Sequence, residues 1–230
     1  MRILLYAIAL LILAGCSMHP PSSTAFMEAL EQSYDGKNTS SYSVKVQHIK
    51  YSHSADEWDL PVGFEKSTAV SPGYVVGWGL LPSPYFHAGG GNKYIAIKGW
   101  VSTIWLAAFT ALYADDEDNS SEATESYSDD EETLDELTLF VFELFSGGFS
   151  FIQQLPIGDH LRIGVEEYIS RNFWIAHLTQ EDFSNVECGV GPYLSIRTNQ
   201  HRFAVESHFG LIDFSDKKRW TIGLTYTYTK

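Results

Sequence analysis

Charged residues in the C-terminal half of this chain occur in pairs of opposite sign at even spacing. Three pairs carry the pattern: Arg162 with Glu166, Glu187 with Arg197, and Arg202 with Glu206. Residues an even number of positions apart share one face of a β-strand. Exposed ion pairs of this kind contribute little to stability, whereas an enclosed face requires every charge to have a partner. We predict that these six residues form a charge network in an enclosed lumen.

Glycine is common on the same face as these charges. Five positions show this: Gly164, Gly189, Gly191, Gly210 and Gly223. Glycine weakens a strand and is a poor choice for a solvated surface. A narrow lumen has a use for it, because small residues leave room for long paired side chains. The glycines therefore favour an enclosed polar face.

Histidines and cysteines form no recognisable catalytic or metal-binding pattern. The eight histidines include no His-Glu-x-x-His helix, and two cysteines provide no zinc-type pair. His160, His177 and His208 are the candidates for a lipid-modifying barrel enzyme, but nothing in the sequence selects one of them. We therefore predict no catalytic residue, no metal site, no cofactor and no enzymatic activity.

Alternation of apolar and polar residues indicates the elements that position these side chains. It is clearest in four stretches: 161–169, 187–197, 202–211 and 220–228. Earlier stretches at 42–46, 73–81 and 93–100 alternate as well. A period of two indicates strands, and their short connections indicate antiparallel hairpins. We predict a mainly β fold, an antiparallel up-and-down barrel of about eight strands.

The middle of the chain is ambiguous between strand and helix. Residues 101–114 are apolar on all sides, and 134–146 follow a possible capping box of Thr133 and Glu136. Short helices are possible near both segments. A transmembrane helix over 94–114 is disfavoured by Lys98.

Between these segments lies a strongly acidic tract. Asp115 to Glu136 contains twelve carboxylates and no Lys or Arg. Such a block repels itself and remains solvated, so we predict an acidic loop over 115–136. Its charge also argues against a nucleic-acid partner.

The N-terminus carries a targeting signal. A basic Arg2 and an apolar run lead into Leu13–Cys16, with the sequence Leu-Ala-Gly-Cys. This motif resembles the lipobox of bacterial lipoproteins. The resemblance implies a signal peptide over 1–15, a lipid such as palmitate on Cys16 as the only attached group, and handling by the lipoprotein sorting machinery. Residues 16–40 are rich in Ser and Pro and are predicted to form a flexible tether with a short helix around 25–33.

The last strand contains a second motif. Four residues carry it: Thr221, Gly223, Tyr226 and Tyr228. The pattern resembles the C-terminal signal of outer-membrane barrels, although Thr229 and Lys230 follow where many such barrels end on an aromatic residue. The resemblance implies recognition by the barrel-assembly machinery.

The direction of the apolar strand face separates two functions. If it meets lipid, residues 41–230 form one outer-membrane barrel domain, a lipid-anchored lipoprotein of structural or interaction type whose ligand the sequence does not identify. If it forms a core, the chain is a lipid-anchored soluble β-domain that binds an apolar ligand, as a lipocalin does. We predict the membrane barrel. Phe203, Leu224 and Tyr226 at the centre, with Arg162 and Arg202 in solvent, would contradict it.

Overall fold

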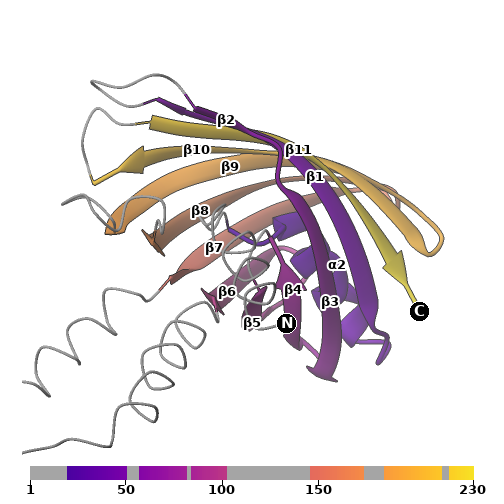
Figure 1. Cartoon of the computed structure of the whole chain (residues 1–230). Helices are drawn as coiled ribbons and strands as arrows, with labels where there is room; N and C mark the ends of the chain where they lie inside the picture. Colours follow the sequence, from indigo (N-terminus) through magenta and orange to yellow (C-terminus); the bar gives the residue numbers. More distant parts are fainter. Residues whose placement is uncertain (1–19, 51–56, 82–83, 103–145, 174–183, 214–217) are drawn as a thin grey trace, which may run out of the picture.

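The computed structural model describes residues 20–50, 57–81, 84–102, 146–173, 184–213 and 218–230. The acidic loop predicted at 115–136 lies outside these residues. So do the possible helices near 101–114 and 134–146, except for residues 101 and 102, which belong to a strand, and residue 146. The described residues form one antiparallel sheet and one helix (Figure 1).

The helix precedes the sheet in the chain. Its bounds and those of the strands are α2 (Ser23–Ser33), β1 (Thr39–Lys50), β2 (Glu57–Asp59), β3 (Val62–Ser71), β4 (Tyr74–Leu80), β5 (Pro84–Gly91), β6 (Ile95–Ser102), β7 (Gly147–Ile157), β8 (Leu161–Phe173), β9 (Ser184–Thr198), β10 (His201–Ile212) and β11 (Lys218–Thr229).

Pairing of the first strand with the last closes the sheet into a barrel. Strand β1 pairs with β11 from Thr39 opposite Thr229 to Lys50 opposite Lys218. Its other edge is shared by β3 and the three-residue β2. Because β2 and β3 occupy one position in the wall, the barrel has ten strands. Closure leaves no free sheet edge, as a membrane barrel requires.

The prediction of about eight strands is therefore wrong in number. Strand β3 is absent from the alternating stretches of the sequence, because Gly63 and charged residues obscure its pattern. Strand β5 is absent from them as well, because its last half consists mainly of glycine. At inward positions, β3 carries Gly63, Glu65 and Ser67 and the last half of β5 carries His87 and Gly89, so neither segment has a continuous apolar signal.

The two ends of the barrel differ. Tight turns at 72–73, 92–94, 158–160 and 199–200 join strands at one end, which we call the turn end. The backbone there visits the left-handed region, with φ of 79° at Gly73 and 54° at Asn199. The start of β1 and the end of β11 lie at this end too, since Thr39 pairs with Thr229. We call the opposite end the loop end.

The strand faces have the predicted orientation. Phe203 and Leu224 point outward and are 58% and 64% exposed, whereas Arg162 and Arg202 point inward and are 7% and 1% exposed. Apolar residues thus cover the outside and charges line the inside. The soluble lipocalin-like alternative is wrong in its central requirement, since the described interior is mainly polar.

The largest departure from prediction is the N-terminal segment. A flexible tether was predicted for 16–40, but α2 is enclosed by the barrel wall (Figure 1). All its residues except Glu31 are buried, so the segment from Ser23 to Ser33 is part of the folded interior. Among the described residues, no helix has the length and apolarity needed to cross a bilayer.

Both ends of α2 are capped by local sequence. The Ser22 hydroxyl accepts a hydrogen bond from the Ala25 amide at 3.0 Å, as an N-cap does. At the other end, Gly36 has φ of 69°, and the Lys37 amide donates to the Gln32 carbonyl at 3.1 Å. This is a Schellman-type stop. The short helix expected around 25–33 is therefore present, in a different setting.

Candidate functional site

The six predicted lumen charges all belong to the inner face of the wall. Arg162, Glu166, Glu187, Arg202 and Glu206 are buried, and Arg197 is partly exposed with a side chain at 24%. They come from β8, β9 and β10, where the period of two directs them inward. The ion pairs shown for the three arginines, however, run to the helix rather than to their predicted strand partners.

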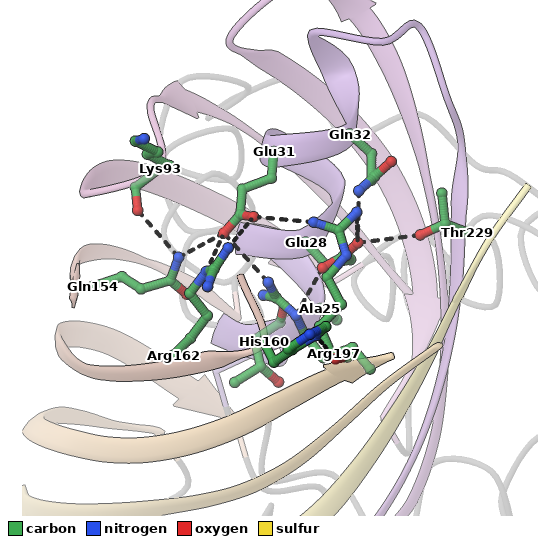
Figure 2. A network of polar contacts seen from close by, with 12 residues as sticks. Ala25, Glu28, Glu31, Gln32, Lys93, Gln154, His160, Arg162, Arg197 and Thr229 are labelled. Carbon is green, nitrogen blue, oxygen red and sulfur yellow. Dashed lines mark hydrogen bonds and ion pairs between the residues drawn. The ribbon is translucent and has the colours of Figure 1, made fainter. Parts of the chain in front are cut away.

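Glu28 of the helix is a deeply buried acceptor. Its Oε2 lies 2.7 Å from Arg202 Nε, and its Oε1 lies 3.3 Å from Arg197 Nη2. Gln32 Nε2 and Thr229 Oγ1 donate to the same Oε1 at 2.9 and 3.2 Å. The carboxylate is 2% exposed, so these partners replace water around a buried charge (Figure 2).

Glu31, one helical turn further on, forms ion pairs with Arg197 and Arg202 as well, and also with Arg162. Arg162 Nε lies 3.2 Å from Oε1, Arg202 Nη2 lies 3.3 Å from Oε1, and Arg197 Nη1 lies 3.4 Å from Oε2. Gln154 Nε2 donates to Oε1 at 2.8 Å. Figure 2 shows Glu31, Gln154, Arg162 and Arg197 converging between helix and wall. We call Arg162, Arg197 and Arg202 the arginine cradle.

The helix glutamates were missed because their segment was taken for a tether. Residues three apart are neighbours on a helix, so Glu28 and Glu31 share a face. Ala25, Phe26, Met27 and Leu30 supply apolar positions around that acidic strip. The sequence contains this amphipathic pattern, but a short helix with two acids near the N-terminus is equally compatible with a solvated surface.

A second network surrounds Glu166 in the middle of the lumen. Lys98 Nζ lies 3.0 Å from Oε1, and His208 Nε2 lies 2.9 Å from Oε2. Ser23 Oγ donates to Oε2 at 2.5 Å, which joins the first residue of the helix to the wall. The wall and the helix thus both supply partners to one buried carboxylate.

Glu206 receives the N-terminus of the helix. Ser22 Oγ donates to its Oε1 at 2.6 Å, and the Thr24 amide donates at 3.0 Å. A carboxylate in this position offsets the positive end of the helix dipole. Beside it, Lys45 and Lys98 donate to the carbonyls of Pro20 and Pro21 at 3.3 and 2.6 Å. The helix therefore runs from mid-lumen, at its N-terminus, to the turn end.

The opposite face of the helix makes apolar contacts with the wall. The buried cluster consists of Phe26, Met27, Ala29, Leu30, Val75, Ala96, Ile152 and Tyr193. Phe26 lies against β5 where Gly89 leaves space, since a Cβ on that glycine would stand 2.8 Å from the phenyl ring. The lumen is thus two-sided, apolar mainly toward β4–β7 and charged toward β8–β10.

A third network lies nearer the loop end and joins residues of the wall. Arg219 forms an ion pair with Glu187, and Tyr168 OH donates to Glu187 Oε1 at 2.5 Å. A Cβ on Gly210 would overlap the Glu187 carboxylate. Gly210 is therefore one of the glycines that give long lumen side chains their room.

The described histidines do not form a catalytic site. Ser67, His87 and Glu65 are close together, but Ser67 Oγ and Glu65 Oε1 both approach His87 Nε2, at 3.4 and 3.5 Å. A catalytic triad needs its acid and its nucleophile on opposite ring nitrogens. His208 is held by Glu166, and His160 Nδ1 lies 3.0 Å from the Arg197 carbonyl oxygen. His177 lies outside the described residues.

No group of three or more His, Cys, Asp or Glu side chains in the described ranges is placed to hold a metal ion. The surface of the described residues includes two sizeable hollows. One, of about 1090 Å³, crosses β4–β6 on the outer face between Trp78, Phe86 and Phe149. The other, of about 500 Å³, lies at the turn end and is bordered by Glu31 and Arg197. Water therefore reaches the edge of the arginine cradle from the turn end.

The four residues of the predicted C-terminal signal all lie in β11. Thr221 and Gly223 face inward, and Tyr226 and Tyr228 face outward. This strand pairs with both β10 and β1, so it completes the barrel. Recognition of the motif by assembly machinery stays a prediction.

Comparisons with known proteins give only a loose structural likeness. No family model matches the chain, and neither does any curated protein. Among solved structures, Ail, the attachment invasion locus protein of Yersinia pestis, has a TM-score of 0.35 and 10% identity and covers 85% of this chain and 99% of its own. Neisserial surface protein A (NspA) has a TM-score of 0.40 and 7% identity, with 83% and 96% covered. Matches this loose carry no functional argument.

Proposed function

We propose that this chain is an integral outer-membrane β-barrel of structural or interaction type, without catalytic activity, whose lumen is closed by its own N-terminal helix. One observation carries the proposal: the outer face of a closed sheet is apolar, and the inner face is charged. In water, exposed side chains such as Phe149 and Leu224, at 67% and 64%, would form an apolar surface far larger than soluble proteins tolerate.

A bilayer makes the same distribution favourable. Each position in the described wall pairs with a neighbour on both sides, so most peptide groups that face hydrocarbon have partners within the sheet. Long strands with short turns at one end are typical of barrels that place the turns in the periplasm and the loops outside. We therefore assign the loop end to the cell exterior, as the surface available for interaction partners.

A lipid on Cys16 is the second part of the proposal. The Leu13–Cys16 motif supports it. Metabolic labelling with palmitate tests it: we expect label on the wild-type chain and none on Cys16→Ser, and equal labelling of the two would contradict lipidation at this residue.

Membrane integration is tested with the same Cys16→Ser variant. We expect the unlipidated chain to stay in the membrane pellet after an alkaline carbonate wash, to need detergent for extraction, and to migrate faster on gels before boiling than after. Recovery of a folded Cys16→Ser chain in the carbonate supernatant would overturn the proposal, because the lipid alone would then hold the protein at the membrane.

A further inference from the structure

The charges of the lumen balance only when the helix is counted. Among the inner side chains that the structure describes, the wall carries six cations, Lys45, Lys98, Arg162, Arg197, Arg202 and Arg219, and four acids, Glu65, Glu166, Glu187 and Glu206. Glu28 and Glu31 of α2 bring the acids to six. The wall alone therefore has an excess of positive charge.

That excess is concentrated at one level of the barrel. In mid-lumen, Lys98 lies beside the wall acid Glu166, and near the loop end Arg219 lies beside Glu187. The arginine cradle at the turn end has its ion pairs with Glu28 and Glu31. Without α2, the charged lining near that mouth would be a cluster of three arginines, the kind of lining that selects anions.

The attachment of the helix allows it to leave the lumen. Residues 34–38, which connect α2 to β1, are exposed at the turn end, and Gly36 there adopts a positive φ of 69°. The hollow of about 500 Å³ at the same mouth already borders Glu31 and Arg197. The polar half of the helix–wall contact consists of carboxylate, guanidinium and amide groups, which can form hydrogen bonds with water once the helix leaves.

We propose that α2 is a removable plug and that the barrel, once α2 is withdrawn through the turn end, conducts small anions past the arginine cradle. This inference rests on the proposed membrane barrel and adds a transport function to it. Ten strands enclose more space than the eight that side chains alone can fill, and here the additional space holds the helix. Its removal leaves a water-filled path lined by uncompensated arginines.

The test is conductance of the full chain in planar lipid bilayers, with chloride as the probe ion. Glu28→Gln with Glu31→Gln weakens the helix contacts while the wall stays intact. Since losing partners of buried ion pairs shifts an equilibrium strongly, we expect the open fraction to rise on the order of 100-fold over the wild type. In a KCl gradient the reversal potential should move toward that of chloride.

Two further variants sharpen the test. Glu65→Gln with Glu187→Gln removes the same charge from wall carboxylates that bind the wall residues Tyr85 and Arg219, and this variant should stay closed. Adding Arg162→Gln, Arg197→Gln and Arg202→Gln to the open variant should keep the conductance and abolish its preference for chloride.

The wild type in moderate urea provides a second route, in case the double variant fails to fold. Urea should produce reversible chloride-selective openings, because barrels of this type resist it better than a short helix does. Protein that inserts and is heat-modifiable, yet stays closed in both experiments, overturns the plug and leaves the membrane barrel standing. Cation-selective openings overturn the role of the arginine cradle. Failure to insert at all would count against both proposals.

Discussion

Buried carboxylates in this barrel depend on particular cationic partners. Glu28 is 2% exposed, and Arg202 Nε lies 2.7 Å from it. Removing one partner of such a pair leaves an uncompensated charge in a place that water reaches poorly. The residue-scale consequence is that single substitutions in the arginine cradle should matter far more than surface ones.

We expect Arg202→Met to lower the free energy of unfolding by about 3–5 kcal/mol. The matched control is Lys37→Met, which removes an exposed pair with Asp35 at 3.2 Å and should change stability by less than about 1 kcal/mol. Urea unfolding in detergent micelles, followed by gel mobility, measures both. Equal midpoints for the two variants would show that the cradle contributes nothing to stability.

Glycines facing the lumen lead to a second prediction. At Gly210 a Cβ would overlap Glu187, whereas at the outward-facing Gly99 the nearest atom would be Phe149 Cε1 at 3.2 Å. We expect Gly210→Ala to cost about 1–3 kcal/mol, as overpacking does, and Gly99→Ala to cost clearly less. The same unfolding assay compares them, and a reversed order would contradict the assignment of inner and outer faces.

At this scale the sequence predicted half of the site. Parity along β8, β9 and β10 placed Arg162, Arg197 and Arg202 on one inner face. Their partners were not predictable in the same way, because pairing depends on which segment fills the lumen. Period-two patterns report the direction of a side chain, not what lies opposite it across a cavity.

At the scale of elements, α2 is held by its ends as well as by its face. Ser22 caps the helix and also donates to Glu206 at 2.6 Å. We expect Ser22→Ala to destabilise the protein by about 1–2 kcal/mol. Ser71→Ala, on an exposed strand end, is the control and should be nearly neutral. Circular dichroism during thermal unfolding gives both values, and no difference between them would mean that the cap is dispensable.

A strand was predictable where large apolar residues occupy its outer positions and clearly different, small polar residues occupy the inner positions between them. Strand β11 satisfies both conditions, and its limits were predicted closely. Strand β5 fails both, since its outer positions include Ala88 and Gly90. The error in strand number therefore follows from composition. A glycine-rich strand such as β5 pairs with its neighbours in the sheet, but its sequence shows little alternation of apolar and polar residues.

For the whole molecule, the apolar outer face of the barrel implies that a charged substitution there costs more stability near mid-bilayer than near the membrane surface. Leu224 lies midway along β11 and points outward, whereas Ile157 ends β7 at the turn end. We expect Leu224→Arg to destabilise the membrane-inserted protein by about 2–4 kcal/mol and Ile157→Arg by about 1 kcal/mol or less. Unfolding from lipid vesicles measures this difference. Equal effects at the two depths would argue against a bilayer around the barrel.

The direction of the strand faces was the decisive whole-molecule prediction, and it is confirmed by the exposed Phe203 and Leu224 and the buried Arg202. Periodicity alone did not decide it. The choice followed from the kind of residues on the polar face, where opposite charges and glycines occur together. The filled lumen was not predicted, because it joins a segment near the N-terminus to the last strand of the wall.

The contact between Thr229 and Glu28 joins residues 201 positions apart. The residues of α2 are synthesised long before those of β11, so the helix segment is present before the wall that surrounds it is complete. The seam between β1 and β11 then closes around an object that is already present, or the helix slips in afterwards through the turn-end mouth. In the first case the final strand pairs around a helix that is already in place, and the hydrogen bond from the Thr229 hydroxyl to Glu28 is the last contact to form.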